Sequence, residues 1–153
     1  MKFLISTNQV NQKFSLIYRE NDYSFDIEPY YDYGFASILV NDLQLEIDDN
    51  GRVLYVWGLC PLIEYEVTTE SPQNYRSKTL AVALNPPPIP GTAHRLNKNE
   101  RWPVYVNKKQ GWVCIGCPKI VDKQLIEFAP NCIAAMKGQE VMAIWLHPLN
   151  LPE

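Results

Sequence analysis

Apolar and polar residues alternate along much of this chain, which is the pattern of β-strands with one buried face. The clearest case is LQLEID at residues 43–48. Asp49, Asn50 and Gly51 follow, and Asn and Gly tolerate the positive φ of a tight turn. The next run, RVLYVW at 52–57, is rich in β-branched and aromatic residues. We therefore predict a β-hairpin over residues 43–57.

Two more hairpins are expected further along the chain. Residues 104–106 and 111–115 flank a polar turn, and residues 132–136 and 140–146 flank a turn that contains Gly138. Ala and Met favour helix, so a helical turn is an alternative in the last pair. Other expected strands lie at 3–6, 14–19, 23–27, 79–84 and 124–128.

No long amphipathic helix pattern is present, and twelve prolines interrupt the chain. Proline is excluded from helix interiors and from central strands. We predict one globular domain over residues 1–153, of α+β class but β-dominated. Antiparallel hairpins would form a sandwich, a roll or a partly open barrel with little helix. The hydrophobic content of 46% is sufficient for a sizeable core.

Residues 85–103, NPPPIPGTAHRLNKNERWP, form the longest segment without a periodic pattern. One interpretation is a surface crossover between two sheets. The alternative is an enzyme or small-ligand site under this loop, formed by His94, Arg95 and Arg101, because long loops are often functional. A histidine needs a positioned partner to act as an acid or base, and the sequence shows no established catalytic motif. We therefore expect a protein that is not an enzyme.

Charge is distributed unevenly along the chain. Residues 20–70 contain twelve acidic residues and one basic residue, Arg52, although the whole chain carries only −3. In one interpretation the acidic strands pair with basic strands from the C-terminal half, which neutralises them. In the other, the carboxylates and the tyrosines between them leave an exposed negative surface.

The second interpretation leads to a functional hypothesis. Tyrosine supplies contact area at low entropic cost, and a negative field speeds the capture of a basic partner. We expect a non-catalytic protein that binds a basic protein partner, as an immunity or inhibitor protein does. The predicted contact residues are Asp22, Asp26, Glu28, Tyr30, Tyr31, Asp32 and Tyr33.

Other partners and locations follow from composition. The acidic balance disfavours nucleic-acid binding, which needs an excess of Lys and Arg. The apolar run near the N-terminus is too short for a signal peptide, and no stretch is long enough to span a membrane. We expect a cytoplasmic protein without a cofactor.

The four cysteines raise a separate question. Cys114 and Cys117 have the C-x-x-C spacing, and with Cys60 and Cys132 they could form a structural zinc site. A redox pair is disfavoured because Pro118 follows and no helix pattern begins there. The expected state is buried, unreactive thiols near the ends of strands.

Overall fold

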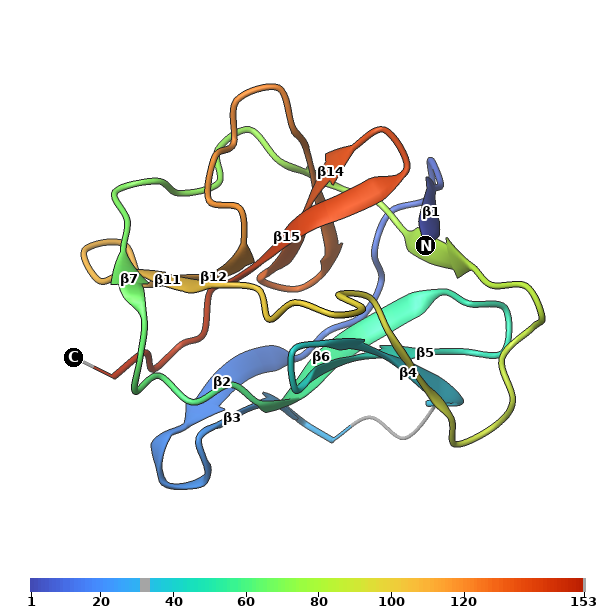
Figure 1. Cartoon of the computed structure of the whole chain (residues 1–153), viewed down its shortest axis with the longest axis horizontal. Coiled ribbons are helices and arrows are strands. Elements are labelled where there is room, and N and C mark those ends of the chain that lie inside the picture. Colours follow the sequence, from blue (N-terminus) through green and yellow to red (C-terminus); the bar gives the residue numbers. More distant parts are fainter. Residues whose placement is uncertain (31–33, 153) are drawn as a thin grey trace.

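The computed structural model describes residues 1–30 and 34–152, and the regular secondary structure of these residues is almost entirely β-strand (Figure 1). Within them the one helical element is a short 3-10 turn, Glu20–Asp22. The strands form three open sheets with mostly antiparallel pairing. The β-dominated class, the antiparallel hairpins and the low helix content predicted from the sequence are confirmed.

The six-stranded sheet is built mainly from the first 60 residues. Its strand order is β10-β4-β5-β6-β3-β2, and only the short β10 runs parallel to its neighbour, β4. The predicted 43–57 hairpin forms β5 and β6, joined by a turn in which Gly51 has φ +83°. The strands are β2 (Ser15–Arg19), β3 (Ser24–Glu28), β4 (Ala36–Val40), β5 (Leu43–Ile47), β6 (Val53–Leu59) and β10 (Ala93–Arg95).

The seven-stranded sheet is built mainly from the last 50 residues. Its order is β7-β11-β12-β15-β14-β13-β8, and both predicted C-terminal hairpins are present in it. Residues 132–136 are extended, so the helical alternative there is wrong. The strands are β7 (Glu66–Val67), β8 (Arg76–Ser77), β11 (Val104–Asn107), β12 (Trp112–Gly116), β13 (Gln124–Ala129), β14 (Cys132–Lys137) and β15 (Glu140–Leu146).

A third sheet pairs β1 (Lys2–Ile5) with β9 (Leu80–Ala83), and it lies beside the two large sheets (Figure 1). One cluster of buried apolar side chains draws on all three sheets, with Phe3, Phe25 and Ile115 each about 1% exposed. A second, smaller cluster includes Trp112 and Trp145 and lies on the other face of the seven-stranded sheet. The seven-stranded sheet therefore has apolar side chains on both faces.

The long loop of residues 85–103 connects the sheets, as the crossover interpretation expected. It leaves β9, adds the three residues of β10 to the edge of β4, and ends at β11. Near its end, Trp102 packs against Gly116, which has φ +117°. A Cβ atom at Gly116 would lie 2.5 Å from the Met142 carbonyl oxygen and 2.9 Å from Cε3 of Trp102. Glycine at this position therefore allows both the backbone turn and the contact with the loop.

The described residues of the acidic segment make few ion pairs with the C-terminal half of the chain. Strands β3 to β6, which lie in the acidic segment, pair with one another and with β2, and their one neighbour from the C-terminal half is β10. Among the described residues, the Arg101–Asp42 contact of 3.2 Å is the one ion pair that joins the segments 20–70 and 71–153. Two strand pairs nevertheless join the acidic segment to the C-terminal half, β4 with β10 and β7 with β11, so both interpretations of the charge pattern stay predictions.

Candidate functional site

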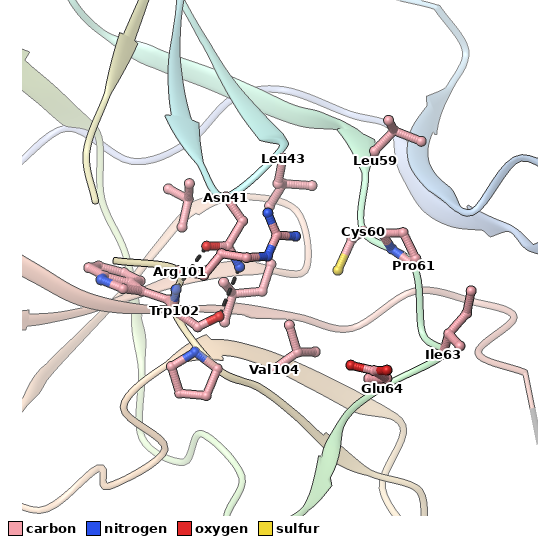
Figure 2. A pocket seen from close by; sticks show the side chains of 13 residues that line it. Asn41, Leu43, Leu59, Cys60, Pro61, Ile63, Glu64, Arg101, Trp102 and Val104 are labelled. Atoms are coloured by element: carbon pink, nitrogen blue, oxygen red, sulfur yellow. Dashed lines mark hydrogen bonds between the residues drawn. The ribbon is translucent and has the colours of Figure 1, made fainter. Parts of the chain in front are cut away.

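A cavity of about 490 Å³ lies where one end of the six-stranded sheet meets β11 and β12 (Figure 2). Two loop segments close it, the end of the long loop and the chain that follows β6. The lining is apolar except for Asn41, Glu64 and Arg101. The apolar lining residues are Val40, Leu43, Leu59, Cys60, Pro61, Ile63, Trp102, Pro103, Val104 and Ile115.

A buried amide pair holds the long loop on one wall. Asn41 has φ +54°, and its backbone N–H donates to Oδ1 of Asn97 at 3.1 Å. Nδ2 of Asn97 donates to Oδ1 of Asn41 at 2.7 Å, and Asn41 also exchanges two 2.9 Å hydrogen bonds with the backbone of Trp102. Both asparagines are almost completely buried. These bonds fix residues 97–102, including Arg101, against the sheet.

A tyrosine holds the opposite wall. The hydroxyl of Tyr18 donates to the Cys60 carbonyl at 2.8 Å and accepts from the backbone N–H of Leu62 at 3.3 Å. Burial of the hydroxyl raises the pKa of Tyr18, which keeps it protonated as a donor. The backbone N–H of Cys60 donates to the Tyr23 carbonyl at 2.9 Å. The start of the segment that carries Glu64 is thus fixed to the six-stranded sheet.

The charged groups of the cavity come from different walls. Figure 2 shows Arg101 beside Asn41 and Trp102, and Glu64 beside Ile63. Nη1 of Arg101 contacts Oδ2 of Asp42 at 3.2 Å, and both side chains are largely exposed. Glu64 has no ion pair with any described residue. The cavity therefore offers one positive and one negative group at the edge of an apolar interior.

Cys60 lines the cavity but has little nucleophilic character. Burial raises the pKa of its thiol to about 12, and the nearby positive charge of Arg101 only partly opposes this shift. The thiolate is the nucleophilic form of cysteine. At neutral pH the Cys60 thiol is therefore protonated and serves as apolar lining.

The predicted loop site of His94, Arg95 and Arg101 is divided by the structure. His94 lies on β10, where Nε2 is 3.2 Å from the Thr92 hydroxyl, and it lines neither hollow that contains Arg101. Arg95 donates to the Asn41 carbonyl at 2.7 Å and shares only a shallow surface hollow with Arg101. Of the three residues, only Arg101 reaches the cavity between the sheets.

The described acidic residues that were predicted to bind a partner lie near one edge of the six-stranded sheet, on β3 and on the turn that precedes it. Asp26 and Glu28 project from β3, and each contacts Arg19 at 3.1 Å. The hydrogen bond with Asp26 is the main cause that raises the pKa of Arg19. Asp22 is exposed in the 3-10 turn and Tyr30 is 77% exposed. Tyr31, Asp32 and Tyr33 lie outside the described residues.

Two further residues extend this acidic surface, and we did not predict them from the sequence. The carboxylate of Glu46 accepts hydrogen bonds from the Trp57 indole at 2.9 Å and from the Ser37 hydroxyl at 3.0 Å. Phe25 lies opposite Gly58 in the antiparallel register of β3 and β6. Asp26 and Trp57 are the next residues in this register, and their side chains lie on the outer side of the sheet. We name Asp26, Glu28, Glu46 and Trp57 the acidic outer face. Strand alternation in LQLEI could have identified Glu46 as outward-facing.

The cysteines do not form a metal centre in the described part of the chain. No group of three or more His, Cys, Asp or Glu side chains is placed to bind an ion there, so the zinc alternative has no support. Cys60, Cys114 and Cys132 are buried, and burial raises the pKa of each thiol. Cys117 differs from the expectation because it is only half-buried, just beyond the end of β12.

Comparisons with known proteins add no identity. No family model, no curated protein and no solved structure matches this chain. Within residues 1–30 and 34–152, no helix has the length and apolar character needed to cross a membrane.

Proposed function

We propose that the protein binds a basic protein partner through the acidic outer face, in the manner of a cytoplasmic immunity or inhibitor protein. The observation that carries this proposal is the common side on which the carboxylates and Trp57 lie. Asp26 and Glu46 each lie between two buried neighbours along their strands, and Trp57 follows the buried Val56. The partner would meet the outer side of the sheet, where these carboxylates lie beside Trp57.

Hydrogen bonds orient the acidic groups before any partner binds. Glu46 is held by Trp57 and Ser37, and Asp26 also accepts a hydrogen bond from the backbone N–H of Ile27 at 2.8 Å. Preorganised groups lose less side-chain entropy on association. Arg19 lowers the net negative charge of the face, but it is a single cation against three carboxylates.

Strand addition is not available at the nearby sheet edge. The outer edge of β2 is occupied, because Asn150 exchanges hydrogen bonds of 2.9 and 2.8 Å with the backbone of Tyr18. The backbone N–H of Leu149 donates to the Leu16 carbonyl at 3.0 Å. An incoming chain could not pair with this part of β2, which favours contact through side chains of the acidic outer face.

Charge reversal tests the proposal. A pull-down from the native host, followed by mass spectrometry, supplies candidate partners, and each purified candidate is then titrated against wild type and Asp26→Lys/Glu28→Lys. We expect the double variant to weaken binding at least tenfold at about 50 mM salt and less at about 500 mM, because screening reduces surface attraction.

The matched control is Glu66→Lys/Glu140→Lys, which makes the same change in net charge on the seven-stranded sheet. It should bind nearly as well as wild type. Equal weakening by both double variants would indicate a net-charge effect and would contradict the assignment of the acidic outer face. Partners that bind all three proteins equally would also contradict it.

A further inference from the structure

We propose that the cavity between the sheets binds a small apolar zwitterion, either a free hydrophobic amino acid or a short apolar peptide. The ligand's apolar body would enter the cavity, its carboxylate would meet Arg101, and its amino group would meet Glu64. This activity is independent of partner binding at the acidic outer face, because that face lies on the solvent side of the sheet, although β5 and β6 contribute residues to both sites.

Size and lining support a small organic ligand. The volume of about 490 Å³ lies within the usual range of small-molecule sites, which are mostly apolar with a few polar groups. Trp102 supplies a partly exposed aromatic surface, and Leu59 and Ile63, which are 52% and 69% exposed, supply aliphatic ones. An apolar body of one or two side chains would release water from these surfaces.

The two charges decide the class of ligand. A simple carboxylic acid would contact Arg101 but would be repelled by Glu64. A simple amine would contact Glu64 but would be repelled by Arg101. Asn41 offers little, because both atoms of its side-chain amide already bond within the protein. A ligand with both charges satisfies both lining groups.

Arg101 is available for a ligand. Its guanidinium has five N–H donors, and among the described residues its one hydrogen-bond acceptor is Asp42, which Nη1 contacts. That ion pair is exposed, and exposed pairs contribute little to stability. The guanidinium can therefore turn toward a carboxylate at small cost, and the charge-assisted bond formed there is among the stronger hydrogen bonds.

The walls are already held in place in the free protein. The Asn41–Asn97 pair fixes the Arg101 side, and the Tyr18 hydroxyl fixes the start of the Glu64 side. These two anchors use different residues and different elements. A preformed site loses little conformational freedom on binding, so even a small ligand can gain measurable affinity.

Calorimetric titration with matched probes tests the proposal. The probes are L-phenylalanine, the dipeptide Leu-Phe, 3-phenylpropionate and phenethylamine, which share an aromatic group and differ in their charges. We expect at least one zwitterion to bind at least tenfold more tightly than both singly charged compounds, and the amino acid and dipeptide arms identify which zwitterion is preferred. Equal or tighter binding of a singly charged probe would overturn the proposal.

Two variants separate the charges. Arg101→Gln should remove the advantage of phenylalanine over phenethylamine, and Glu64→Gln should remove its advantage over 3-phenylpropionate. Lys98→Gln and Glu100→Gln are matched controls, because these exposed side chains do not line the cavity. The controls should bind as wild type does, and equal loss in them would contradict the assignment.

A second measurement locates the ligand. Cys60 lines the cavity, so a bound zwitterion should slow its alkylation by iodoacetamide at alkaline pH, as followed by mass spectrometry. Cys117 lies elsewhere and should be alkylated at an unchanged rate. Absence of both heat and protection with all four probes at millimolar concentration would overturn the proposal, without affecting partner binding at the acidic outer face.

Discussion

The two large sheets share one apolar core but differ in their outer faces. On the six-stranded sheet, the outer side of β5 carries polar residues whose side chains are partly exposed, and its burial alternates residue by residue. On the seven-stranded sheet, every residue of β12 is buried and so are five of the six residues of β14. The difference follows from what covers each sheet. A strand with one face in water alternates, as β5 does, whereas a strand covered on both faces need not, and β4 and the first four residues of β6 show that the six-stranded sheet is also covered in part.

Aromatic contacts form much of the second covering. Trp112 stacks on His147 with ring centroids 4.4 Å apart, and it contacts Trp145 and Tyr75 edge-on at 6.3 Å. Trp145 is fully buried, and its indole N–H has no acceptor among the described residues. The cluster of Trp112 and Trp145 on the outer side of the seven-stranded sheet, the outer cluster, is therefore a second, smaller core. Substitutions on the two outer faces should differ accordingly in their cost.

A charge introduced into each outer face should have the largest effect. Ala135→Asp would bury a carboxylate in the outer cluster of the seven-stranded sheet. An unpaired buried charge costs at least about 3–5 kcal/mol, so we expect little folded protein. Gln44→Asp on β5 should change the free energy of unfolding by less than about 1 kcal/mol. Urea unfolding followed by circular dichroism measures both. Similar costs would show that the two faces are equally covered.

Truncation of a tryptophan on each face should have the next largest effect. Trp145→Ala leaves a cavity in the outer cluster and should cost about 3–5 kcal/mol. Trp57→Ala removes a side chain that is 38% exposed and one hydrogen bond to Glu46, and should cost about 1 kcal/mol. Denaturant midpoints of the two variants give the comparison. A Trp57 cost equal to that of Trp145 would be incompatible with an open acidic outer face.

The third change concerns how buried polar groups are satisfied. Asn97→Ala would leave the Asn41 backbone N–H and side-chain oxygen each without one partner, so we expect a loss of about 1–3 kcal/mol. Asn99→Ala, two residues away and exposed, is the control and should be nearly neutral. Thermal unfolding measures both. Comparable stabilities of the two variants would mean that the amide pair does not anchor the loop.

The smallest effect is expected from a thiol in the outer cluster. Burial raises the pKa of Cys114 above that of the unfolded thiol. The folded state then keeps the proton while the unfolded state ionises, so this contribution is complete below about pH 8.5 and is lost as pH rises above it. At pH 9 the loss is roughly 1 kcal/mol. Between pH 7 and pH 9 the free energy of unfolding of wild type should therefore fall by about 1 kcal/mol more than that of Cys114→Ala. Parallel pH profiles would show that Cys114 is open to solvent.

The hairpins were predictable because their signals are local. Alternation in 43–57, the turn at Gly51 and the turn at Gly138 each depend on a few neighbouring residues. β10 could not be predicted, since its three residues lie in a loop pattern and are extended only because β4 offers an unpaired edge. β4 was missed because its burial is nearly continuous and shows no period.

The candidate sites were predicted only in part. The charge segregation was visible in the sequence, but the pairing of Asp26 and Glu28 with Arg19 depends on the register of β2 and β3. Arg101 was predicted from the sequence as a site residue. Its separation from His94 could not be predicted, because it follows from the path of the loop along β4. Glu64 and Cys60 meet Arg101 only because two sheets distant in sequence pack together, and no local pattern encodes that contact.

Gly116 has a practical consequence for any attempt to redesign the cavity. Its missing side chain makes room for Trp102, the neighbour of Arg101 and itself part of the cavity lining. A library that diversifies residues 101–103 tests the proposed ligand site without this second effect only while residue 116 stays glycine. If residue 116 is varied as well, loss of the proposed ligand binding would report backbone strain and a displaced indole, and selection would not separate misfolded clones from clones with a changed site.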